Sequence, residues 1–156
     1  MNSITPQQFE AVLPLAVAWA EEQETRIVRS GVGLTEPQLA DARQLGMRFP
    51  ERVRLLRVSE IPLPVHPVLA AAAAMTNLIS PFTAGMTLRY GIFIRDDCWG
   101  RRLLVAHELV HVSQYERLGG LEEFLRPYLM ECLTPSGYPH GLLETEADVL
   151  SKKLCA

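Results

Sequence analysis

The segment His107-Glu108-Leu109-Val110-His111 constrains this chain more than any other part of its sequence. On an α-helix, residues four apart lie on one face, so His107 and His111 would present two imidazole rings side by side. In the His-Glu-x-x-His pattern the two His bind zinc and the Glu acts as general base. The segment therefore predicts a metal site on a helix, with Glu108 as the catalytic base.

The residues around this motif predict that its helix is buried. Apolar residues cover most of the helix circumference, namely Leu103, Leu104, Ala106, Leu109, Val110 and Val112. A single buried His is commonly a hydrogen-bonded core residue, which is the alternative interpretation. Two His and a Glu in an apolar helix would be costly to desolvate without a partner, so the pattern favours metal binding.

Composition and charge narrow the classes of protein that remain. The 156 residues are 48% hydrophobic and 21% charged, which is typical of one soluble globular domain. The net charge of −3 provides no basic surface for nucleic acid. Cys98, Cys132 and Cys155 are widely spaced, which argues against a disulfide framework and for a reducing compartment. With neither a signal peptide nor a membrane span expected, we predict a cytoplasmic protein that does not contact a membrane.

The first half of the chain predicts helices and one strand. Thr5 and Thr35 each begin a capping box, and Gly31 and Gly46 mark the expected ends of the two helices that follow. Pro14 should kink or interrupt the first of them. A strand is expected at Val53–Val58, and a helix from His66 to about Leu78, with His66 at the helix start rather than as a ligand.

The second half predicts a strand directly before the motif helix. Residues 87–95 alternate between apolar and other side chains, the pattern of one strand, and an Asp at 96 or 97 could cap the motif helix. Such a strand is a place for an extended peptide to pair. Helices are expected at 121–133, bent at Pro127, and at 142–154. The fold class predicted is mainly helical α+β in one domain, residues 1–156, with a helical N-terminal part to about residue 80 and the metal site in about 86–156.

A catalytic metal site needs a third protein ligand. A third His would require Gly at 114 and His at 117, but Gln114 and Arg117 stand there, so a carboxylate from a later helix is expected. Glu144 and Glu146 both flank the expected buried stripe of the last helix, which comprises Leu143, Ala147, Leu150 and Leu154. Periodicity leaves both open, including both as solvated charges. Asp148, four residues after Glu144, favours Glu144 because a metal-bound His usually has such a partner.

His107-Glu108-Leu109-Val110-His111, followed by Glu144-Thr145-Glu146-Ala147-Asp148, resembles the gluzincins, whose pattern is H-E-x-x-H and then E-x-x-x-D on a second helix. The last 70 or so residues are also similar to compact bacterial zincin-like domains, some of which belong to contractile injection systems. The resemblance implies a minimal zincin-like fold with one Zn²⁺ per chain. It also implies Glu144 as third ligand and Asp148 as hydrogen-bond acceptor from a zinc-binding His, and Glu146 stays the alternative ligand.

These features lead to a main functional prediction and a competitor. The main one is a zinc metallopeptidase in which Glu108 takes a proton from zinc-activated water that attacks a peptide bond of a peptide or protein substrate. Tyr138 and His140, in the loop before the last helix, are candidates for stabilising the oxyanion. The competitor is a zinc-binding interaction module without turnover, serving a protein partner that the sequence does not identify. A metal-free helical domain ranks third.

Overall fold

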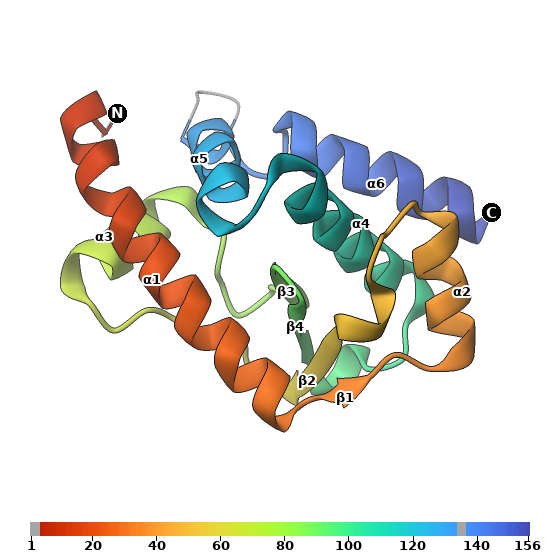
Figure 1. Cartoon of the computed structure of the whole chain (residues 1–156). Coiled ribbons are helices and arrows are strands. Elements are labelled where there is room, and N and C mark those ends of the chain that lie inside the picture. Colours follow the sequence, from red (N-terminus) through yellow and green to blue (C-terminus); the bar gives the residue numbers. More distant parts are fainter. Residues whose placement is uncertain (1–3, 134–136) are drawn as a thin grey trace.

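The computed structural model describes residues 4–133 and 137–156 (Figure 1). Its helices are α1 (Pro6–Ser30), α2 (Glu36–Gln44), α3 (Pro67–Thr76), α4 (Arg102–Leu118), α5 (Leu121–Cys132) and α6 (Leu142–Cys155). Its strands are β1 (Val32–Gly33), β2 (Arg54–Val58), β3 (Gly85–Leu88) and β4 (Gly91–Arg95), with 3₁₀ turns at Pro50–Arg52 and Asp96–Cys98. The predicted mainly helical α+β fold is confirmed. None of the described helices combines the length and apolar character that a membrane span requires.

The four strands form one mixed sheet in the order β1-β2-β4-β3. β2 and β4 are parallel, with Leu56 opposite Phe93, whereas β1 pairs with β2 and β3 pairs with β4 in antiparallel fashion. β4 is therefore central, and β3 lies at an edge of the sheet. The N-terminal part, expected to be helical apart from a strand at Val53–Val58, supplies that strand as β2 and also β1, which was not expected.

Helices cover both faces of this small sheet (Figure 1). Phe93 of β4 belongs to a core cluster that includes Ile27 of α1 and Phe124 of α5. Its neighbours Ile92 and Ile94 point to the other face and join a second cluster with residues of α2 and α4. Because side chains alternate along a strand, a strand buried on both faces is apolar at successive positions. β4 has this property and anchors α4 to the rest of the chain.

The helix starts follow the sequence prediction closely. Thr5 and Gln8 form a reciprocal capping box at α1, and Thr35 and Gln38 form another at α2. His66 caps α3, since its Nδ1 accepts a hydrogen bond from the backbone N–H of Val68. The sequence predicted that Pro14 would kink or interrupt α1. The helix is not interrupted: it continues to Ser30, with the Pro14 ring on its exposed side.

The single strand predicted over 87–95 is wrong, because this segment is a β-hairpin. Arg89 and Tyr90 form a two-residue turn between β3 and β4, and Arg89 has a φ of 59°. Glu24 of α1 accepts hydrogen bonds from the Arg89 guanidinium and from the backbone N–H of Tyr90. A positive φ is unfavourable for a residue with a side chain. The interactions with Glu24 from a distant part of the chain offset this cost, and local alternation could not reveal them.

The expected Asp cap of the motif helix is also wrong. The N-cap of α4 is Arg101, with no side-chain capping hydrogen bond. Asp96 instead pairs with Arg57 of β2, and Asp97 pairs with Arg95 at the end of β4. The two carboxylates therefore pair with residues near the ends of β2 and β4.

Candidate metal centre

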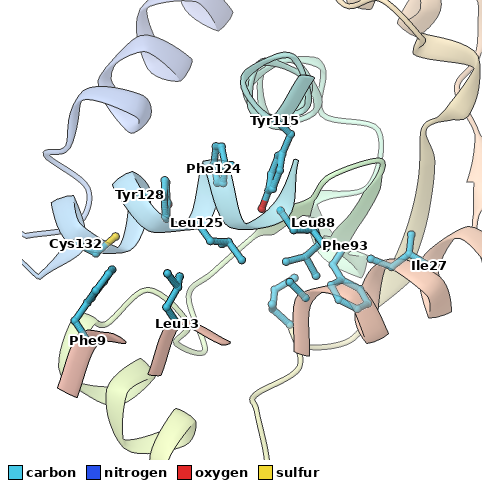
Figure 2. Packing of buried hydrophobic residues seen from close by; sticks show 13 residues of the cluster. Phe9, Leu13, Ile27, Leu88, Phe93, Tyr115, Phe124, Leu125, Tyr128 and Cys132 are labelled. Carbon is cyan, nitrogen blue, oxygen red and sulfur yellow. The ribbon is translucent and has the colours of Figure 1, made fainter. Parts of the chain in front are cut away.

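α4 carries the motif through the centre of the molecule, packed beside α6 (Figure 1). Leu109 and Val112 lie in the core cluster shared with α2 and the sheet. Tyr115 lies in the other cluster, where its ring stacks on Phe124 at 3.8 Å. Figure 2 shows the cluster that contains Tyr115 and Phe124, in which side chains of α1 face those of α5. With both sides of α4 packed, the motif residues are held on a rigid helix.

His107, His111 and Glu144 converge at one point. Glu144 Oε2 lies 3.1 Å from His107 Nε2 and 3.2 Å from His111 Nε2. The imidazole rings meet nearly edge to face, with centroids 4.9 Å apart. Glu144 and His111 are almost fully buried, and His107 is partly exposed. Two imidazole nitrogens and a carboxylate oxygen in this arrangement form a candidate metal-binding triad.

Asp148 and Gln114 contact Nδ1 of the two His rings, which directs Nε2 of each ring toward Glu144. Asp148 Oδ1 lies 3.0 Å from Nδ1 of His107 and can accept its proton. Gln114 Oε1 lies 2.7 Å from Nδ1 of His111. The amide of Gln114 can have only this orientation, because its Nε2 donates to two acceptors, Leu143 O and Glu146 Oε1. Both rings thus have a hydrogen-bond acceptor at Nδ1 and direct Nε2, the candidate ligand atom, at the same point.

Glu144 comes from the buried side of α6. The buried residues of this helix are Glu144, Ala147 and Ser151, whereas the expected stripe of Leu143, Ala147, Leu150 and Leu154 is buried only at Ala147. The expected stripe was therefore misplaced around the helix, because the polar triad occupies part of the contact with α4. The hydroxyl of Tyr128 on α5 donates a hydrogen bond to Glu144 Oε1 at 3.0 Å, which restrains the carboxylate from a second direction.

Glu146 lies apart from the triad. Its Oε1 accepts hydrogen bonds from Gln114 Nε2 at 2.9 Å and from Arg117 at 3.0 Å. The two carboxylates that periodicity could not separate thus have different positions. Glu144 faces both His rings, and Glu146 holds the amide that orients His111.

Glu108 is buried against β3, beside the triad. The hydroxyl of Thr87 lies 2.6 Å from Glu108 Oε2 and 3.1 Å from its carbonyl oxygen. Gly85 leaves room for the same carboxylate, because a Cβ at this position would lie 3.0 Å from Glu108 Oε1. The edge strand therefore both holds and accommodates the carboxylate that the motif assigns as a base.

The charges of His107, His111 and Glu144 strongly affect one another's pKa values. Burial lowers the pKa of His107, but its hydrogen bond with Glu144 and the nearby charge of Glu108 outweigh burial and raise that pKa to about 9. The pKa of His111 is raised for the same reasons, again against the effect of burial. Burial opposes ionisation of Glu144, yet its hydrogen bonds with both His hold its pKa well below the usual range. The site thus stabilises positive charge between its carboxylates, as a cation-binding site must.

The remaining predicted residues have separate positions. Tyr138 is partly buried and borders the same cavity as Glu144, and burial together with the charge of Glu144 raises its pKa, so it stays protonated. His140 is exposed, and no contact described joins it to the triad. Tyr115 is buried in the core, and its hydroxyl donates to Thr87 O at 3.1 Å. Part of the loop predicted before the last helix, residues 134–136, lies outside the described residues.

Sequence reasoning missed the roles of Gln114, Thr87 and Tyr128. Gln114 was considered only as a departure from a third-His pattern, although its position three residues after His111 is a helical neighbour spacing that could have suggested contact. Thr87 and Tyr128 reach the site from β3 and α5, at distances along the chain for which no local spacing rule exists.

The donor atoms fit a divalent metal ion. Ligand bonds of about 2.0–2.2 Å in a tetrahedral arrangement place neighbouring ligand atoms about 3.3 Å apart. The distances from Glu144 Oε2 to the two Nε2 atoms, 3.1 and 3.2 Å, are close to this separation. A metal ion bound by these three residues would have a fourth position free for water or substrate, which catalytic sites require.

The assignment of a candidate metal site rests on geometry alone, because comparison with known proteins found no match. No protein-family model matches the chain, and neither curated proteins nor solved structures give a match.

Proposed function

We propose that this protein is a zinc-dependent metallopeptidase with His107, His111 and Glu144 as ligands and Glu108 as general base. The observation that carries the proposal is the buried Glu108 carboxylate, held by Thr87 beside three converging ligand atoms. A purely structural metal site has no need of a base. Nitrogen and carboxylate ligands in a three-residue set are typical of catalytic zinc, whereas magnesium and calcium prefer oxygen ligands alone.

The residues of the chain divide the work of hydrolysis. Bound zinc would supply a Lewis acid that acidifies water and stabilises the oxyanion. Glu108 takes the proton of the attacking water and passes it to the leaving amine. Thr87 donates to one oxygen of Glu108, which leaves the other for the water. The protonated Tyr138 hydroxyl, at the cavity beside Glu144, is available to donate a hydrogen bond to the oxyanion.

The substrate class follows from the edge strand. Among the described strands β3 lies at the end of the sheet order, paired with β4 on one side and packed against α4. An extended peptide that added to β3 as a further strand would run past Glu108, which Thr87 of β3 holds. Strand pairing needs only a backbone, so this arrangement favours a polypeptide substrate.

The test compares wild type with Glu108→Gln in a broad peptide-library digest. Gln keeps the size of the side chain and cannot take a proton, so we expect equal zinc content, close to one per chain, and a loss of cleavage of about 10²- to 10⁴-fold. Equal cleavage by the two proteins would contradict the role of Glu108. Wild-type protein that stays free of zinc after incubation with zinc, or a His107→Ala variant that retains it, would contradict the metal site.

The burial of the triad supports a second candidate function. Glu108, His111 and Glu144 are each 5–6% exposed, which limits access of a peptide backbone. A zinc-binding interaction module without turnover would suit such a site. Zinc-loaded wild type that cleaves nothing in the library would favour this module.

A further inference from the structure

An apolar cavity extends from the candidate metal centre into the N-terminal half of the chain. It has a volume of about 130 Å³ and is bordered by Glu108, His111 and Glu144 on one side. Its opposite walls come from α1 and α3. In Figure 2 Phe9 of α1, which lines this cavity, faces the residues of α5. The N-terminal helices, which take no part in the metal site, thus shape the space next to it.

The cavity walls contain hardly any charge. Between Ile61 and Leu88, the stretch that includes α3 and β3, there is no Asp, Glu, Lys or Arg. The carboxylates that border the cavity are Glu108 and Glu144, and both are engaged, with Thr87 and with the two His respectively. A charged group that entered would lose its hydration without gaining a partner, which is costly. The lining selects for an uncharged apolar group.

The volume sets the size of that group. An apolar cavity of about 150 Å³ stays dry and binds benzene. The 130 Å³ measured here therefore accepts a group of about the size of a Leu or Phe side chain, and it is too large for Ala to fill. Small residues create this space: Ala16 on α1, and Ala72 and Ala73 on α3, all line the cavity.

We propose that the cavity binds a Leu- or Phe-sized apolar side chain of the substrate next to the bond that is cut. α1 and α3 then determine specificity through Ala16 and Ala73. This inference rests on the proposed peptidase function, because that function identifies the bound group as part of a peptide. The N-terminal half of the chain thus contributes walls of the specificity pocket, and the C-terminal half contributes the remaining walls and the residues of the chemistry.

The first experiment measures cleavage of peptides that differ at the residues flanking the cut. Zinc-loaded wild type is expected to prefer Leu or Phe over Ala at one flanking position by about 10- to 200-fold in kcat/KM, the discrimination that such pockets achieve. Ala73→Leu fills the cavity and should remove or reverse this preference at unchanged zinc content. Ala74→Leu, one residue on and exposed, is the matched control and should keep it. Cleavage without any apolar preference, or an Ala73→Leu profile equal to wild type, would overturn the proposal.

The second experiment measures the cavity without catalysis. Indole and isobutylbenzene are titrated into chelator-treated wild type by NMR. Saturable binding is expected, with a loss of at least tenfold in Ala73→Leu and in Ala16→Leu, and none in Ala74→Leu or Ala18→Leu, whose positions are exposed. Variants are compared after circular dichroism confirms folding. Absence of binding to wild type overturns the cavity proposal, whereas binding without zinc uptake or cleavage retains the cavity as an apolar side-chain site and rejects only the peptidase.

Discussion

Gln114 fixes the orientation of His111, although it cannot itself bind a metal ion in this arrangement. Its Oε1 accepts from His111 Nδ1, and its Nε2 is held by Leu143 O and Glu146. Gln114→Met keeps the volume and removes the acceptor, so the ring loses its preferred tautomer. We expect zinc affinity to fall about 10- to 100-fold, the usual effect of such partners. Competition with a chromophoric chelator measures this. Ser113→Ala, on the neighbouring position, is the control, and equal affinities for all three proteins would refute the role of Gln114.

The two glutamates of α6 should differ sharply when substituted. Glu144→Gln replaces a charged ligand that faces both His rings, so zinc retention should be lost. Glu146→Gln removes charge from a group that contacts only Gln114 and Arg117 among the interactions described, so zinc content should change little. Metal analysis after dialysis distinguishes them. If Glu146→Gln lost zinc and Glu144→Gln kept it, Glu146 would be the ligand.

At the scale of elements, the fit between β3 and α4 depends on Gly85. A Cβ here would meet Glu108 Oε1 at 3.0 Å and Cγ at 3.2 Å, so the carboxylate must move by a few tenths of an ångström in Gly85→Ala. Because misplacement by 1 Å can cost about 10²-fold, we expect kcat to fall by roughly three- to tenfold. Steady-state kinetics at equal zinc content test this. Unchanged kcat would mean that Glu108 adapts freely or is not the base.

The passage from α1 to β1 depends on Gly31 for a different reason. Its φ of −83° is available to any residue, but a Cβ would lie 2.7 Å from the backbone oxygens of Ile27 and Leu55. The sequence correctly predicts Gly31 as a helix end, but the close approach of α1 to β2 is what requires glycine. Gly31→Ala should lower the free energy of unfolding by about 1–3 kcal/mol, as overpacking does.

Urea denaturation measures the effect of Gly31→Ala. The control is Gly33→Ala in β1, where the nearest atom to the added Cβ is an Arg54 side-chain nitrogen at an ordinary 3.6 Å. Equal stability of the two variants would contradict a specific close approach at Gly31.

At the scale of the whole molecule, the ion pair between Glu24 and Arg89 is one of several that join the two halves of the chain. Glu24 of α1 is 7% exposed, pairs with Arg89 and also accepts from Tyr90 N–H in the hairpin turn. Removing one partner of a buried pair costs about 3–5 kcal/mol, and the partial exposure of Arg89 reduces this to about 2–3 kcal/mol in Glu24→Gln. Urea unfolding measures this loss of stability. The control is Glu21→Gln, an exposed position on the same helix. A difference below about 0.5 kcal/mol would show that the pair between Glu24 and Arg89 does not stabilise the position of α1.

The features that the sequence determined by itself are local. His107, Glu108 and His111 share one helix, so helical geometry alone places the two rings together and the Glu beside them. Thr5 and Gln8 form their capping box within one turn for the same reason. Mainly helical α+β architecture also follows from periodicity. In each case the interacting groups are at most four residues apart, where backbone geometry sets the distance.

The tertiary structure alone decided which carboxylate faces the rings. Glu144 and Glu146 are equivalent in the periodic pattern, where Asp148 merely favours Glu144, and the rotation of α6 against α4 is what turns Glu144 toward the rings. That rotation results from packing of both helices and from hydrogen bonds that span about thirty residues, such as the one from Gln114 to Leu143 O. Tertiary packing also produced three other features. These are the turn at Arg89, the support of Glu108 by Thr87 and the cavity under α1 and α3. Each depends on elements brought together by core packing, which no local pattern encodes.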